Sequence, residues 1–175
     1  MERISKENYY LDIAETVLER ATCLRRIYGA IVVNNDEIIS TGYNGAPRGR
    51  ANCVDMGFCS REMLQVPRGQ RYELCRSVHA EANAIISAAR RDMVGGTLYL
   101  VGRDAQTGAL LGDATSCSMC RRLIINAGLA RVVIRRTKLA FDVIPVSDWI
   151  AEDDTAPVQP LVPEGHDIYR KGESS

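Results

Sequence analysis

Two short clusters in the sequence combine residue types that bind metals and move protons. The first is His79-Ala80-Glu81, and the second is Cys117-Ser118-Met119-Cys120. Both clusters stand at the predicted start of a helix, where the helix dipole favours thiolates. Thiolates and imidazoles are preferred zinc ligands. Taken alone, a Cys-x-x-Cys pair is also compatible with a dithiol redox centre or with coincidence.

The two clusters together predict a catalytic zinc site. If the two helix starts lie side by side, His79, Cys117 and Cys120 supply three ligands and leave the fourth tetrahedral position to water. Residues two apart on a helix diverge by about 200° around its axis, so Glu81 is not expected to bind the same ion. A carboxylate beside a metal-bound water is instead suited to moving protons, and we assign that catalytic role to Glu81.

The elements that must position these residues follow from hydrophobic periodicity and turn residues. We expect helices over 6–21, 78–91 and 117–127, a hairpin made of strands 29–33 and 37–43, and further strands over 97–101 and 131–134. Two irregular segments interrupt this pattern: a long excursion over 44–75 and an insertion over 102–116. Strands that alternate with helices after an opening hairpin predict an α/β fold whose mixed sheet is covered by helices on both faces.

Length and composition favour a single domain over residues 1–150, followed by an acidic, proline-containing tail over 151–175. No stretch approaches the roughly 20 apolar residues of a membrane-spanning helix, and the N-terminus lacks a secretory signal pattern. We therefore expect a cytoplasmic protein that binds no membrane. In such a compartment the six cysteines are expected to be thiols or metal ligands in preference to disulfides.

The charge of the chain narrows the class of molecule that it is expected to bind. The 22 basic and 22 acidic residues cancel, so no global field draws the protein onto DNA or RNA, and nucleic acid is not an expected partner. Between Arg48 and Arg76, however, six arginines face three acidic residues. This segment either forms a local site for a small anion or is solvated surface.

The combined pattern resembles the cytidine deaminase superfamily, in which His-x-Glu is followed by Pro-Cys-x-x-Cys, with Ser116 standing here in place of the proline. Within the superfamily the chain is similar to the deoxycytidylate deaminases. The discriminating run is Gly42-Tyr43-Asn44-Gly45-Ala46-Pro47-Arg48-Gly49. The resemblance covers about residues 6–134 and implies a three-layer α/β/α sandwich with a mixed, mainly five-stranded sheet.

This resemblance also implies an activity, namely hydrolysis of dCMP to dUMP and ammonia at a catalytic Zn²⁺. Asn44 is then expected to contact the sugar or base through its amide, and Arg26 and Arg48 to hold the phosphate. Ordinary turn and surface roles are the alternatives for these three residues. The family further implies a regulatory nucleotide, dCTP or dTTP with Mg²⁺, and a homo-oligomer, often a hexamer.

Four further cysteines lie outside the catalytic motif. Cys23 and Cys53 resemble ligands of a second, structural zinc found in some deoxycytidylate deaminases, and we add Cys59 and Cys75 as its remaining ligands. Such a site would fix the irregular excursion. The alternative is that these residues are free, buried thiols.

Other substrates and one other class of protein stay open. The insertion over 102–116 directly precedes Cys117 and therefore leads into the predicted metal site. It could shift the specificity toward tRNA adenosine, guanine or a modified pyrimidine. A non-catalytic zinc or nucleotide-binding accessory protein could share the fold. Glu81 argues against the accessory protein, because a purely structural zinc site has no use for an unliganded acid.

Overall fold

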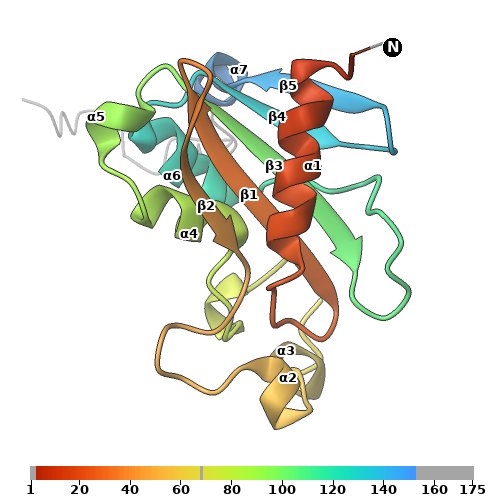
Figure 1. The fold of residues 1–175 in the computed structure, drawn as a ribbon. Helices are drawn as coiled ribbons and strands as arrows, with labels where there is room; N and C mark the ends of the chain where they lie inside the picture. The colour runs from red at the N-terminus through yellow and green to blue at the C-terminus, as the bar shows by residue number, and fades with distance from the viewer. Residues whose placement is uncertain (1–2, 68, 153–175) are drawn as a thin grey trace, which may run out of the picture.

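A mixed five-stranded sheet forms the middle layer of the protein, in the strand order β2-β1-β3-β4-β5. We describe it from a computed structural model over residues 3–67 and 69–152, so the predicted tail, apart from its first two residues, lies outside the described residues. Helices cover both faces of the sheet (Figure 1). The predicted three-layer α/β fold is therefore confirmed.

The sheet is antiparallel except at one pair of strands. Its strands are β1 (Arg26–Asn34), β2 (Glu37–Tyr43), β3 (Thr97–Asp104), β4 (Arg131–Arg135) and β5 (Phe141–Pro145). β3 and β4 run parallel, and all other neighbours run antiparallel. The predicted Asn/Asp turn joins β1 to β2: Asn35 and Asp36 both have positive φ, 49° and 66°, as a two-residue type I′ hairpin turn requires.

One face of the sheet is covered by α1 (Lys6–Leu18), which crosses in front of it in Figure 1. The predicted apolar stripe of this helix is buried: Leu11 and Ala14 are fully enclosed, and they pack in one cluster with Ile31 of β1 and Val101 of β3. Burial of this stripe stabilises the helix far more than its local sequence does.

The other face carries α4 (Ala80–Ile86) and α6 (Ser118–Ala127), together with the short helices α5 (Arg90–Met93) and α7 (Val146–Ala151). Ala84 of α4 and Ile124 of α6 are fully buried in one core with Val32 and Leu100 of the sheet. α4 and α6 also contact each other. Within residues 3–67 and 69–152, no helix is long and apolar enough to cross a membrane.

Over its described residues, the predicted irregular excursion between β2 and α4 contains only one-turn elements: α2 (Cys53–Met56), α3 (Ser60–Met63) and the 3-10 turn η1 (Tyr72–Leu74). In Figure 1 it lies beyond the end of the sheet at which β2 finishes. Its two ends are joined, because the N–H of Val78 donates to the carbonyl of Gly45 (2.8 Å) and the N–H of Gly45 donates back to Val78 (3.2 Å).

Some boundaries differ from the sequence prediction. The helix expected over 78–91 is two helices, because α4 ends at Ile86 and the Ser87 hydroxyl donates back to the Asn83 carbonyl (2.7 Å). β5 and α7 were not predicted at all. β5 is an edge strand whose residues are mostly exposed, so it lacks the alternation that marks a half-buried strand.

Two glycines allow helices to lie unusually close to the sheet. A Cβ atom on Gly42 of β2 would lie 2.3 Å from both the carbonyl oxygen of Ala80 and the nitrogen of Ala84 in α4. On the opposite face, a Cβ on Gly29 of β1 would lie 2.1 Å from the carbonyl oxygen of Ala14 in α1. Backbone atoms of packed helices cannot yield cheaply, so both positions require glycine.

We predict that Gly42→Ala lowers the free energy of unfolding by about 3 kcal/mol, because the added methyl group must push α4 away from β2. Urea unfolding followed by circular dichroism measures this change. Gly112→Ala is the matched control, since a Cβ there would come no closer than 3.5 Å to the nearest atom, the carbonyl oxygen of Arg136. Equal stability of the two variants would contradict the close approach of α4.

Candidate active site

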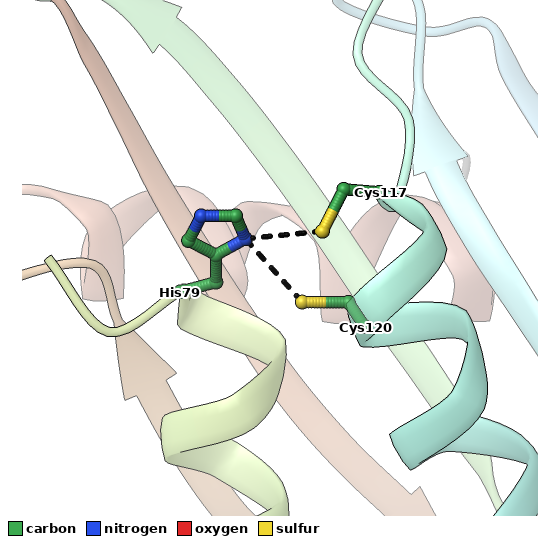
Figure 2. A group of neighbouring side chains, drawn as sticks. All are labelled: His79, Cys117 and Cys120. Atoms are coloured by element: carbon green, nitrogen blue, oxygen red, sulfur yellow. Dashed lines mark hydrogen bonds between the residues drawn. The ribbon is translucent and has the colours of Figure 1, made fainter. Parts of the chain in front are cut away.

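His79, Cys117 and Cys120 converge where α4 and α6 begin (Figure 2). The His79 Nδ1 atom lies 3.4 Å from the Sγ atom of Cys117 and 3.4 Å from that of Cys120. All three ligand atoms lie within 4.8 Å of one another. Over the part of the chain that the structure describes, this is the one group of three such residues with so close an approach.

These positions fit a zinc ion. Sulfur and nitrogen ligands at the usual bond lengths of a tetrahedral zinc are separated by roughly 3.6 Å, close to the observed 3.4 Å between nitrogen and each sulfur. The donor set of two thiols and one imidazole is also the set that zinc prefers. His79, Cys117 and Cys120 would hold the ion, and three protein ligands leave a coordination position for water.

Helix starts place the ligands. His79 and Cys117 are the residues that precede α4 and α6, and both have extended backbone (φ −71°, ψ 156° and φ −69°, ψ 164°). Neither side chain caps its own helix by a hydrogen bond, so both remain available to a metal. Cys120 lies in the first turn of α6 and is buried, with only 2% of its surface exposed.

The electrostatics of the three groups favour a thiolate. A hydrogen bond from Cys120, assisted by the neighbouring His79, lowers the pKa of the Cys117 thiol to about 4. The same hydrogen bond raises the pKa of Cys120. Burial acts to lower the pKa of His79, but Cys117 and the Glu81 carboxylate more than offset it, so that this pKa is raised. Cys117 is therefore negatively charged at neutral pH, as a metal ligand must be.

Glu81 lies in the first turn of α4 and is almost fully enclosed, with 5% of its surface exposed. Burial raises the pKa of its carboxyl group above the ordinary value for glutamate, and the nearby His79 only partly opposes the shift. A buried carboxyl group with a raised pKa holds a proton more readily than an exposed glutamate does, as a group that must both take and give a proton requires.

A pocket of about 260 Å³ opens onto these residues. His79, Ala80, Glu81 and Cys117 line it at the predicted metal site. The rest of its lining is Cys23, Arg25, Arg26, Tyr28, Asn44, Cys59, Arg61, Gly69, Tyr72, Cys75, Ser77, Asp113 and Thr115. The volume is that of a site for one small ligand, near the lower end of the range for small-molecule pockets, roughly 300–1,000 Å³. The excursion and the insertion thus both contribute walls to the predicted active site.

The three predicted substrate contacts lie in different surroundings. Asn44 lines the pocket, and its amide bridges β1 by accepting from the N–H of Tyr28 (2.7 Å) and donating to the carbonyl of Arg26 (2.9 Å). Arg26 also lines the pocket, with its Nη1 atom 4.0 Å from the Asp113 carboxylate. Arg48 is exposed and is not part of the pocket lining, so its phosphate contact stays a prediction.

The four remaining cysteines gather at the outer side of the pocket. Cys23, Cys59 and Cys75 line it, and Cys53 is buried beside them. Burial raises the pKa of Cys53, and the three other thiols add to this effect. Among the described residues, however, no three of these sulfur atoms lie within 4.8 Å of one another. The second zinc site stays a prediction.

The insertion reaches the pocket through Asp113 and Thr115, as its position before Cys117 led us to expect. Ser116, at the position of the family's proline, is enclosed to 1% exposure. Its hydroxyl makes no hydrogen bond of ordinary geometry among the described residues, but it lies beside the Glu81 carboxyl group and acts to lower the pKa of that group. The Ser116 carbonyl accepts a hydrogen bond from Arg121 (3.1 Å), which holds the turn into α6.

Sequence reasoning missed two pocket residues in the excursion. Arg61 is a buried arginine, 7% exposed, and Tyr72 packs edge-on against the His79 ring, with ring centroids 5.0 Å apart. An irregular segment shows no periodicity from which burial could be predicted. The available signal was the excess of arginines between Arg48 and Arg76, which pointed to a local anion site without singling out Arg61.

Comparisons with known proteins agree with this geometry. Residues 4–136 match the family described as "Cytidine and deoxycytidylate deaminase zinc-binding region". The deoxycytidylate deaminase of Mycobacterium phage D29 is 36% identical over 138 residues, covering 76% of this chain and 96% of the phage protein. The deoxycytidylate deaminase of Schizosaccharomyces pombe is 33% identical over 131 residues, covering 75% of this chain and 37% of the yeast protein.

A solved structure extends the comparison to three dimensions. The crystal structure of dCMP deaminase from the cyanophage S-TIM5 in complex with dCMP and dUMP has a TM-score of 0.52 and 25% sequence identity, covering 76% of this chain and 84% of that one. The ligands His79, Cys117 and Cys120 and the acid Glu81 all lie within the residues that match the family. The chain belongs to the zinc-dependent cytidine and deoxycytidylate deaminase family.

Proposed function

We propose that the protein hydrolyses dCMP to dUMP and ammonia. One observation carries this proposal: Glu81, which is buried and has a raised pKa, faces the same pocket as the zinc ligands His79 and Cys117. An acid that can both take and give protons beside an open metal site is the machinery of hydrolytic deamination. The likeness to the deoxycytidylate deaminase of phage D29, at 36% identity, supports dCMP as the substrate.

The metal ligands and Glu81 would have separate roles in this reaction. A zinc ion held by His79, Cys117 and Cys120 would supply Lewis acidity that makes a water molecule nucleophilic at neutral pH. Glu81 would take one proton from the attacking water and pass it to N3 of the cytosine ring, and then take the second proton from the hydroxyl group formed at C4 and pass it to the leaving amino group. Ammonia leaves only after protonation, so the two transfers by Glu81 bracket the reaction.

The pocket walls would orient the nucleotide. Asn44 keeps one lone pair on its amide oxygen and one amide proton beyond its two hydrogen bonds to β1, and its side chain is held rigidly by those bonds. It can therefore present fixed polar groups to the sugar or base. Arg26, at the pocket mouth, is placed to interact with the phosphate if it exchanges its contact with Asp113.

We predict that Glu81→Gln retains zinc and loses roughly 10²–10⁴-fold in kcat, because the amide cannot accept or release a proton. Ammonia release measures turnover, and elemental analysis measures zinc. Glu37→Gln, an exposed glutamate on β2, is the matched control and should keep wild-type activity. Full activity of Glu81→Gln would refute the proton-transfer role.

A panel of substrates tests which base the protein deaminates and whether the substrate must carry a phosphate group. We expect ammonia release from dCMP to exceed that from CMP, dCTP, deoxycytidine, guanine and adenosine-containing RNA when kcat/KM values are compared. Turnover of guanine or RNA with no turnover of any cytosine nucleotide would sink the proposal, and a higher kcat/KM for deoxycytidine than for dCMP would assign the enzyme to nucleosides.

Three further features belong to the proposal because the family resemblance implies them. They are a structural zinc held by Cys23, Cys53, Cys59 and Cys75, an effector nucleotide (dCTP or dTTP) with Mg²⁺, and assembly into a homo-oligomer such as a hexamer. The gathering of the four thiols around Cys53 supports the first of these, since a zinc ion would need only to draw neighbouring sulfurs together.

Elemental analysis is expected to find two zinc ions per chain. His79→Ala should lose one of them together with activity, because it removes a ligand of the catalytic site. Cys53→Ser should lose the other while keeping the catalytic zinc. A single zinc that disappears in His79→Ala and stays in Cys53→Ser would reject the structural site.

A further inference from the structure

We propose that Arg61 binds the 5′-phosphate of the nucleotide in the active-site pocket and so determines the preference for nucleotides over nucleosides. This inference rests on the proposed function and names a phosphate-binding residue for it. Arg61 lies in α3, within the excursion. It is enclosed to 7% exposure and still lines the pocket.

The charges around the pocket single out Arg61. Three arginines line the described pocket wall, and two of them face carboxylates: Arg25 lies 3.0 Å from Glu62, and Arg26 lies 4.0 Å from Asp113. Both are also considerably more exposed than Arg61. Within residues 3–67 and 69–152, Arg61 forms no ion pair; the exposed Glu73 carboxylate is near enough for Arg61 to contribute to its lowered pKa, but it pairs with Arg71.

The hydrogen bonds of Arg61 use only part of its guanidinium group. Nη2 donates to the carbonyls of Pro67 (2.8 Å) and Gln70 (2.6 Å), which holds the loop before η1 against α3. Nε is buried and has no partner among the described residues. Nη1 also donates to none of them, and it is not fully enclosed. The guanidinium therefore keeps unused donors at the pocket.

The location of Arg61 suits a phosphate that accompanies a base bound at the metal. The guanidinium carbon lies 4.6 Å from the centroid of the Tyr72 ring, and that ring lies 5.0 Å from the His79 ring. Arg61 can therefore be no farther from the His79 imidazole than these two steps combined. A 5′-phosphate on a nucleotide whose base lies at the metal site would therefore be within reach of Arg61.

Energetics favour an anionic ligand over a purely structural role. Two backbone carbonyls and the face of Tyr72 satisfy some donors and only partly offset the charge of a buried cation. A neutral side chain such as glutamine could make the loop contacts without the cost of burying a charge. A phosphate, with its paired oxygens, would both neutralise the guanidinium and occupy its remaining N–H groups.

The test compares dCMP with deoxycytidine in Arg61→Gln, which keeps a donor for the loop carbonyls and removes the charge. We expect the KM for dCMP to rise about 10- to 100-fold, because the variant loses one charged hydrogen-bonding contact with the phosphate. The kcat for dCMP should change little. The kcat/KM for deoxycytidine should stay near its wild-type value. Arg71→Gln is the matched control: it removes an exposed arginine from the same segment, paired with Glu73 and outside the pocket lining, and should change neither substrate.

An equal loss for dCMP and deoxycytidine would show that Arg61 only holds the loop, and would overturn the proposal, as would an unchanged KM for dCMP. Arg61→Lys guards against misfolding of the glutamine variant. It keeps the positive charge but lacks the two parallel N–H donors of the guanidinium group, so it should weaken the binding of dCMP and leave the kcat/KM for deoxycytidine unchanged.

Product binding separates this inference from the proposed function. Calorimetric titration with dUMP and deoxyuridine needs no turnover. If the wild-type chain deaminates no cytosine nucleotide and yet binds dUMP more tightly than Arg61→Gln does, the proposed reaction fails and the phosphate contact stands. If both proteins bind dUMP with equal affinity, the assignment of Arg61 is wrong.

Discussion

The close approach of α4 to β2 at Gly42 is the constraint on which the active site depends. α4 begins next to His79, so the distance between this helix and the sheet sets the position of the imidazole ring. α6 contacts α4 and begins directly after Cys117, so the two thiols take their positions from the same packing. A metal site tolerates displacements of its ligands of only a few tenths of an ångström. A side chain at Gly42 would displace α4, and with it His79, by more than this. Gly42 on β2 thus contributes to the metal site without contacting it.

Residues of the rigid core and residues of the excursion have different tasks. The helix starts provide the metal ligands and Glu81, the parts that the chemistry of deamination needs in any substrate. The excursion and the insertion provide Arg61, Tyr72 and Asp113, which line the pocket beside the metal site. This division allows substrate preference to change while the reaction is kept, because the walls can vary without moving the ligands.

The sequence predicted the ligands and the central elements well because their signals are local. His79 and the pair Cys117 and Cys120 stand at helix starts, where spacing and the helix dipole restrict what such residues can do, and the structure brings them together. Arg61 is held by the carbonyls of Pro67 and Gln70, and no periodic pattern in the sequence predicts this packing. β5 was missed for a related reason: as an exposed edge strand it is held by its pairing with β4, which no local pattern reveals.

The backbone pair between Gly45 and Val78 has a consequence for how this family can diversify. It joins the two ends of the excursion immediately before His79, so the thirty or so residues between them form a loop closed at its base. The free energy of closing such a loop changes slowly with its length. The backbone position of His79 is therefore set by this pair and by α4, and it does not depend on how many residues the loop between Gly45 and Val78 contains.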